Sequence, residues 1–129
     1  MVNLKNNFKS KKLHFLSLAF EQAKINLGST KSNPSVGCII EKDGAVLSSG
    51  YTSLNGRPHA EQNALRKRKN FENANLYVTL EPCSHHGVTP ACTKIIIKKK
   101  IKKVFYSSFD FDSRSKKKSK KILNKKKIF

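Results

Sequence analysis

The sequence predicts a domain of the α/β class, in which helices and strands alternate along the chain and pack together as layers. Apolar residues recur every three or four positions over residues 13–27, which is the pattern of an amphipathic helix. Two apolar segments flank Asp43-Gly44, an arrangement that is typical of a β-hairpin. From residue 59 onward, helical patterns alternate with short apolar strands.

The first predicted helix ends near Gly28, because glycine commonly follows the last turn of a helix. His14 lies off the apolar stripe of this helix and is expected to face solvent. The hairpin joins strands over residues 36–40 and 45–47, and Cys38 is expected to be a small core residue without a metal role. The inward stripe of the helix would consist of Leu13, Leu16, Phe20, Ala23 and Leu27.

Two helices and two strands are expected in alternation after the hairpin, followed by a last helix. A helix over residues 59–69 would turn Ala60, Ala64 and Leu65 inward, and a strand would follow over 76–80. The remaining elements are a helix that begins with Thr89 as N-cap and Pro90 as first residue and carries Ile95, Ile96 and Ile97, a strand over 104–106, and a very basic helix over 116–124.

The composition favours a single soluble domain. The chain has 129 residues, of which 37% are hydrophobic and 27% charged, and no apolar run approaches the roughly 20 residues that cross a bilayer. No signal peptide is evident at the N-terminus, so we expect a cytoplasmic protein without membrane association. Three cysteines form no disulfide framework, and in a reducing compartment cysteines near histidines more often bind metal or take part in chemistry.

The net charge of +19 raises the alternative of a nucleic-acid partner. Most lysines, however, lie in undifferentiated runs from Lys94 onward, and arginine, which reads phosphate bidentately, is scarce. The lysine runs are therefore interpreted as solvated faces and as a bias in the composition of the source genome. A nucleic-acid partner is not expected.

One set of residues carries the chemistry of a zinc site. His59, Cys83 and Cys92 supply one nitrogen and two sulfur ligands, and three protein ligands leave the fourth position of a catalytic zinc for water. His59 and Cys92 each fall at the start of a predicted helix, where unpaired N–H groups favour a thiolate. We therefore expect one Zn²⁺ per chain.

Glu61 lies two residues after the histidine ligand and is expected to move protons without binding the metal. Zinc lowers the pKa of a bound water to about 7, and a carboxylate beside that water accepts its proton and returns it to the substrate. Attack on an amidine-like carbon with loss of ammonia is hydrolytic deamination. A His-x-Glu followed by Pro-Cys-x-x-Cys is the signature of the zinc base deaminases, and this sequence matches it except for a longer gap between the cysteines.

The segment 79–92 closely resembles the deaminase domain of the bifunctional deaminase/reductases of riboflavin biosynthesis, a family that also places eight residues between its two cysteines. The resemblance extends to residues 33–38, 56–61 and 63–65. The resemblance implies a cytidine-deaminase-like three-layer sandwich, with a mixed sheet of four to five strands and helices on both faces. It implies 2,5-diamino-6-(5-phosphoribosylamino)pyrimidin-4-one as substrate and a homo-oligomer. It also implies substrate contacts from Asn33, Ala60 and His85.

The chain departs from that family at three places. Val88 stands where the family usually has a lysine or arginine suited to the substrate phosphate, and residues 110–114 lack the two prolines that usually follow the fourth strand. The fifth strand is at best begun at residues 127–129, and no reductase domain follows within these residues. We expect one deaminase domain over residues 1–129, either stand-alone, decayed or part of a longer protein.

Several alternatives stay open. A base deaminase of the same superfamily acting on nucleic acids or nucleosides would suit the positive charge, and a decayed, inactive zinc domain would suit Val88. The intact Glu61 argues against decay. Glu81 would either orient the site or serve as a structural hydrogen-bonding group, and His86 is expected at the surface or at the rim of the pocket.

Overall fold

The computed structural model describes residues 4–85, 87, 90–110, 114 and 116–129. Its centre is a sheet of four strands in the order β2-β1-β3-β4. β1 is antiparallel to both β2 and β3, whereas β3 and β4 are parallel, so the sheet is mixed. The strands are β1 (Gly37–Lys42), β2 (Ala45–Tyr51), β3 (Asn75–Leu80) and β4 (Lys103–Ser108).

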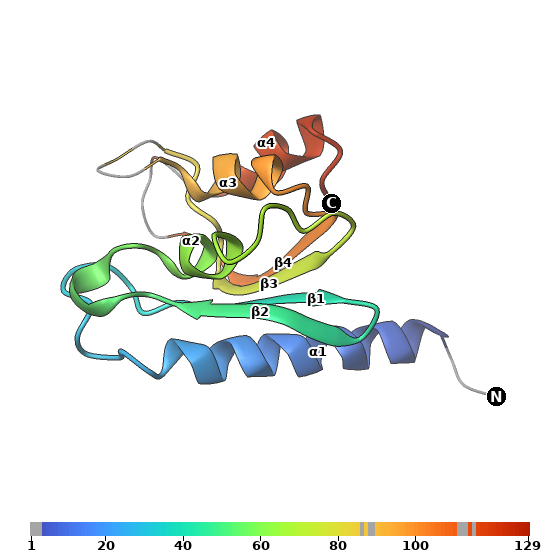
Figure 1. Cartoon of the computed structure of the whole chain (residues 1–129), viewed down its shortest axis with the longest axis horizontal. Coiled ribbons are helices and arrows are strands. Elements are labelled where there is room, and N and C mark those ends of the chain that lie inside the picture. The colour runs from blue at the N-terminus through green and yellow to red at the C-terminus, as the bar shows by residue number, and fades with distance from the viewer. Residues whose placement is uncertain (1–3, 86, 88–89, 111–113, 115) are drawn as a thin grey trace.

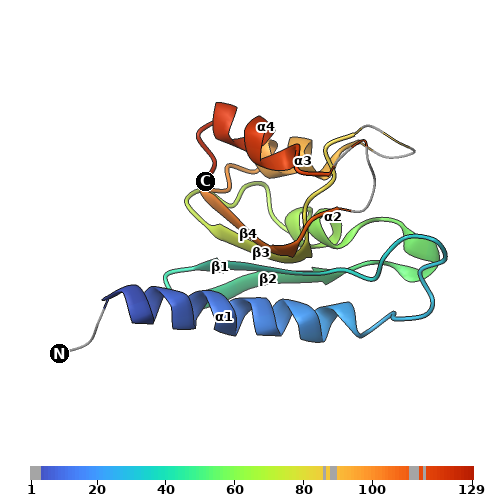
Figure 2. The same cartoon turned by 180° about the vertical axis from the view of Figure 1, so that it is seen from behind.

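Helices cover both faces of the sheet. α1 (Leu4–Ala23) runs along one face, while α2 (Ala60–Leu65), α3 (Cys92–Lys98) and α4 (Ser119–Lys125) lie on the other (Figures 1 and 2). The expected three-layer architecture with a mixed four-stranded sheet is therefore confirmed. Within the described residues none of the helices has the length and apolar character needed to cross a membrane.

The two central strands, β1 and β3, separate two hydrophobic clusters. Cys38 and Ile40 of β1 belong to the cluster under α2 and α3, whereas Ile39 belongs to the cluster under α1. This alternation follows from the two-residue repeat of a strand. Because both faces are covered, these strands read as continuous apolar runs rather than as alternating ones. The prediction that Cys38 is a core residue is confirmed, since its side chain is fully buried.

The prediction of which side of α1 is buried was wrong for most of its residues. Leu16 is buried, but Leu13 is 58% exposed and Phe20 is 45% exposed. The helix instead turns Phe15 and Ala19 toward the sheet. His14 is exposed, as expected.

Contacts with the sheet determine which side of α1 is buried. A Cβ atom at Gly37 would overlap the backbone of Ala19, so the helix approaches β1 closely there because position 37 is glycine. The ring of Phe15 packs on Tyr77 with centroids 5.2 Å apart, and Tyr77 stacks on Phe105 at 4.8 Å. These long-range contacts outweigh the local periodicity.

The helix boundaries differ from the predictions at several ends. α1 ends at Ala23, and a series of turns leads to Gly28, whose φ of 88° requires glycine. α3 begins at Cys92 with Ala91 as N-cap, so Pro90 lies before the helix; Thr89 lies outside the described residues. α2 ends four residues earlier than predicted, and α4 begins three residues later.

The last residues of the chain pack against the same core. Ile128 is buried in the cluster that also holds Leu123 of α4, and the backbone N–H of Phe129 donates to the carbonyl of Lys102 at 3.1 Å. Residues 127–129 belong to none of the four strands of the described sheet.

Candidate metal centre and active-site cavity

Three ligand side chains converge where α2 and α3 begin. His59 is the N-cap of α2, Cys92 is the first residue of α3, and Cys83 lies in the loop after β3. Their ligand atoms all lie within 4.8 Å of one another. The Nδ1 atom of His59 is 3.8 Å from the Sγ of Cys83 and 3.5 Å from the Sγ of Cys92.

This arrangement fits a zinc ion. A tetrahedral zinc with Zn–N and Zn–S distances of about 2.0–2.3 Å keeps its ligand atoms about 3.5–3.8 Å apart. The two separations from the imidazole nitrogen of His59 match those values. One imidazole and two thiols also leave a fourth position for water, as in catalytic zinc sites.

The first turn of α3 helps to hold Cys83 as a thiolate. The backbone N–H of Cys92 donates to the Sγ of Cys83 at 3.1 Å, and the N–H of Thr93 donates to the carbonyl of Cys83 at 3.2 Å. Hydrogen bonds from Cys92 and His59 lower the pKa of the Cys83 thiol to about 4, although burial opposes this shift. The bond with Cys83, together with burial, raises the pKa of Cys92 well above its ordinary value.

Glu61 is positioned beside this cluster in the first turn of α2. Its side chain is buried. Burial, with a further contribution from the negative charge of Cys83, raises the pKa of Glu61 to about 7. A carboxyl group with a pKa near neutrality is suited to accept and release a proton during one reaction cycle.

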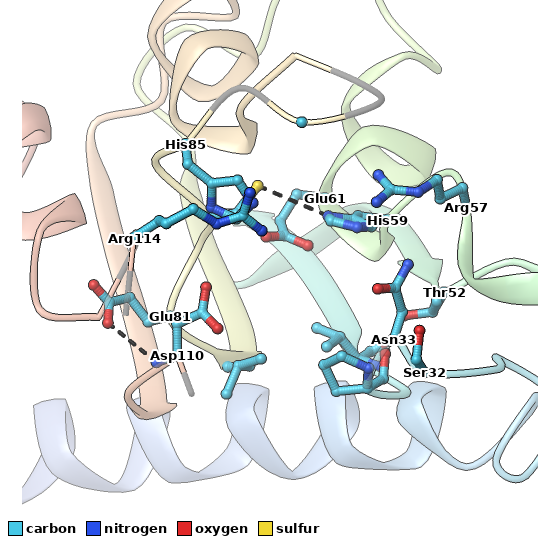
Figure 3. Close-up of a pocket in the computed structure, with 15 residues that line it drawn as sticks. Ser32, Asn33, Thr52, Arg57, His59, Glu61, Glu81, His85, Asp110 and Arg114 are labelled. Carbon is cyan, nitrogen blue, oxygen red and sulfur yellow. Dashed lines mark hydrogen bonds between the residues drawn. The ribbon is translucent and has the colours of Figure 1, made fainter. Parts of the chain in front are cut away.

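Glu61 and two of the ligands open onto a cavity of about 380 Å³, a size that suits a small molecule. Figure 3 shows Glu61 and His59 between two arginines that approach from opposite sides. The described lining residues are Ser32, Asn33, Pro34, Val36, Thr52, Arg57, His59, Glu61, Leu80, Glu81, Cys83, His85, Gly87, Asp110 and Arg114.

Two of the three predicted substrate contacts line this cavity. Asn33 and His85 are both part of its wall. The amide Nδ2 of Asn33 donates to the carbonyl of Gly56 at 2.9 Å, which fixes the orientation of this side chain. Ala60 is fully buried in the core and is not among the described lining residues, so its contact with substrate stays a prediction. His86 lies outside the described residues.

The loop that carries Asn33 is tied to the end of β2 by Thr52. The backbone N–H of Val36 donates to the Oγ1 of Thr52 at 2.9 Å, and this hydroxyl donates in turn to the carbonyl of Pro34 at 3.2 Å. Thr52 was not predictable as a site residue, because a single threonine after a strand carries no local signal.

Glu81 is an anchor for the segment that follows β4. Its buried carboxylate accepts backbone N–H bonds from Asp110 at 3.1 Å and Lys117 at 2.8 Å on Oε1. Oε2 accepts the N–H of Ser119 at 3.2 Å and its hydroxyl at 2.8 Å. Burial alone would raise the pKa of Glu81, but these bonds outweigh it and hold the pKa below its ordinary value. Glu81 was expected either to orient the site or to serve as a structural hydrogen-bonding group, and these contacts support the second role.

Comparison with known proteins agrees with this geometry. The family model described as the cytidine and deoxycytidylate deaminase zinc-binding region matches residues 9–108. The chain belongs to this family of zinc-binding deaminases. The three clustered ligands and Glu61 all lie within the matched segment of the deaminase family.

Individual relatives show which branch of the deaminase family this chain resembles. The chain is 46% identical over 107 residues to the riboflavin biosynthesis protein RibD of Actinobacillus pleuropneumoniae, which covers 81% of the chain and 28% of the relative. The structure of Acinetobacter baumannii RibD matches with a TM-score of 0.87 and 39% identity, covering 92% of this chain and 34% of that chain. A deaminase/reductase of Thermotoga maritima matches with a TM-score of 0.83 and 35% identity, covering 92% and 35%. The chain thus spans about a third or less of the length of these relatives.

Proposed function

We propose that the chain catalyses the zinc-dependent hydrolytic deamination of 2,5-diamino-6-(5-phosphoribosylamino)pyrimidin-4(3H)-one. The products are 5-amino-6-(5-phosphoribosylamino)uracil and ammonia, and the reaction belongs to riboflavin biosynthesis. The observation that carries the proposal is the His59, Cys83 and Cys92 cluster beside Glu61, in a chain 46% identical to a RibD protein. The Thermotoga maritima neighbour is named for this deaminase activity and for a reductase activity.

Each residue of the site has a definite task in this reaction. A zinc ion held by His59, Cys83 and Cys92 would supply the Lewis acidity that lowers the pKa of water to about 7. Glu61 accepts the proton of the attacking water and passes protons to the ring nitrogen and to the departing 2-amino group, which leaves as ammonia. Asn33, whose amide is oriented by Gly56, contributes a polar group for holding the ring.

The test is ammonia release by the purified, zinc-loaded chain. We expect release from the phosphoribosylamino pyrimidine and none from cytidine or tRNA. Replacement of Glu61 by Gln should leave the zinc content unchanged and lower turnover by about 10²–10⁴-fold, because only proton transfer is removed. Unchanged ammonia release by that variant would rule out the proposed role of Glu61, and release from cytidine alone would rule out the proposed substrate.

A second candidate function rests on the basic face of α4. Lys117, Lys120, Lys121 and Lys125 line one shallow groove with Asn124, and such a cluster attracts polyanions. A deaminase that acts on a base in RNA would use this face for electrostatic binding. It would release ammonia from the tRNA control and would bind RNA with a steep dependence on salt.

The location and assembly of the protein belong to the same proposal. A cytoplasmic homo-oligomer is consistent with a small-molecule enzyme, and sedimentation of the zinc-loaded chain would measure its assembly.

A further inference from the structure

The cavity has a buried end and an exposed end. At the buried end lies Glu61, which is only 4% exposed. Arg57 and Arg114 also line the cavity, but both are exposed, so they lie at its mouth. A substrate with its reacting ring beside Glu61 would therefore extend its other end toward the two arginines.

The described cationic side chains at the mouth of the cavity are arginines and not lysines. The chain contains far more lysine than arginine, yet the described lining residues with a permanent positive charge are Arg57 and Arg114. A guanidinium group binds a phosphate through two parallel hydrogen bonds, which a lysine ammonium does not reproduce. At an exposed mouth the phosphate also keeps part of its hydration, so binding it does not require burial of a double charge.

The two arginines come from different parts of the chain, and the residues beside Arg57 are held by hydrogen bonds. Arg57 lies between Gly56, whose carbonyl accepts the amide of Asn33, and Pro58, whose carbonyl accepts the N–H of Ser53 at 3.1 Å. Figure 3 shows the side chains of Arg57 and Arg114 directed toward the middle of the cavity from opposite sides.

One carboxylate binds a described residue on each side of Arg114 in the sequence. The backbone N–H groups of Asp110 and Lys117 both donate to Oε1 of Glu81. The carboxylate of Glu81 is thereby occupied by donors of its own chain and competes little for a cation in the cavity. Asp110 lies on the same wall as Arg114 and weakens the positive potential there, so the larger effect on an anion is expected from Arg57.

We propose that Arg57 and Arg114 bind the 5-phosphate of the substrate at the mouth of the cavity and so provide the positive charge that Val88 does not. This inference rests on the proposed function, because it assigns one end of that substrate to a pair of residues. It makes the two arginines specificity-determining residues, while the proton transfer remains with Glu61.

The first experiment compares the substrate with its dephosphorylated form, 2,5-diamino-6-ribosylaminopyrimidin-4-one. Replacing Arg57 by Ala should lower the preference in kcat/KM for the phosphorylated form by about 10-fold, replacing Arg114 by Ala should lower it less, and the double replacement should lower it by up to about 100-fold. Most of the change should be in KM. Arg66, an exposed arginine after α2 that does not line the cavity, provides the matched control Arg66→Ala. An unchanged preference in the double variant would overturn the inference.

A second experiment does not depend on turnover. Binding of ribose 5-phosphate and of ribose to the zinc-loaded chain is measured by calorimetry, with Glu61→Gln as background. The inference requires that ribose 5-phosphate binds more tightly than ribose and that the difference disappears in the double variant Arg57→Ala, Arg114→Ala. Equal binding of the two sugars to the wild-type chain would overturn it. Ribose 5-phosphate binding that depends on the two arginines, in a chain that releases no ammonia, would support the phosphate site and refute the proposed reaction.

Discussion

Replacement of Glu81 by Gln tests how strongly one carboxylate holds the wall of the cavity. The carboxylate accepts four hydrogen bonds, two on each oxygen. Glutamine keeps one acceptor oxygen, and its NH₂ group fits best toward Ser119, because a hydroxyl group is able to accept a hydrogen bond as well as donate one. In that orientation the backbone N–H of Ser119 has lost its acceptor. The N–H groups of Asp110 and Lys117 then donate to a neutral oxygen instead of a charged one.

The magnitude follows from these losses. A buried N–H without a partner costs about 1–3 kcal/mol, and each bond to a neutral acceptor is weaker than one to a charged acceptor by about 1 kcal/mol. Glu81→Gln should therefore lower the free energy of unfolding by about 3–5 kcal/mol, a large share of the roughly 5–15 kcal/mol typical of a small domain.

Urea unfolding of the zinc-loaded chain measures this change. Glu72, an exposed glutamate, supplies the matched control, and Glu72→Gln should change stability by less than about 0.5 kcal/mol. A double-mutant cycle between Glu81→Gln and Ser119→Ala should show coupling, because the two side chains are 2.8 Å apart. A loss of less than about 0.5 kcal/mol for Glu81→Gln, equal to that of the control, would refute the anchoring role.

Three further predictions follow from the remainder of the structure. Phe15→Ala should lower the free energy of unfolding by about 3 kcal/mol, because Phe15 is buried against Tyr77. Phe20→Ala should lower it by less than about 1 kcal/mol, because Phe20 is 45% exposed. Equal losses in urea unfolding would contradict the packing of α1. Burial alone would raise the pKa of Glu41, but its bonds with Lys11, Asn75 and the Gly44 N–H outweigh burial and lower the pKa. The pKa of Glu41 in the folded chain is therefore below its ordinary value of 4.5. The stability that Glu41 contributes is fully present above pH 4.5 and is lost as the pH falls through the folded pKa. In urea unfolding at a series of acid pH values, Glu41→Gln should therefore lose less stability on acidification than the wild-type chain. Zinc loading at pH 7 should release about one to two protons per ion. Cys92 must lose its proton, and His59, whose pKa is raised by its hydrogen bond with Cys83, releases up to one more, while Cys83 is already a thiolate. Calorimetry in buffers of different ionisation enthalpy measures the number, and a value near zero would contradict this assignment.

Local signals were sufficient for some elements of the fold. Asp43 and Gly44 both have positive φ angles, 52° and 86°, so the Asp-Gly pair that predicted the hairpin is also the turn that forms it. The clustering of His59, Cys83 and Cys92 was predictable for a similar reason, because zinc chemistry restricts residue type and spacing together. The role of Glu61 in proton transfer stays a prediction.

Other features depend on contacts that no local pattern contains. Apolar residues occur at several angles around α1, and the buried side is chosen by the close approach at Gly37 and by the ring of Tyr77. The start of α3 was misplaced because Thr89-Pro90 looks like a helix start in isolation. In the structure the first N–H groups of the helix, those of Cys92 and Thr93, are taken up by Cys83, nine and ten positions earlier.

The stretch from Glu81 to Cys83 explains why the two ends of the cavity are expected to vary separately. Cys83 is bound by the first turn of α3, so the metal end depends on α3. Glu81, two residues before it, is bound by the segment between β4 and α4, which carries Arg114. The cysteine ligands therefore rest on contacts with α3, whereas the Arg114 side of the proposed phosphate site depends on contacts with Glu81. Substitutions of Glu81 are therefore expected to alter the contacts with Asp110 and Lys117 and to leave the contact of Cys83 with α3 in place.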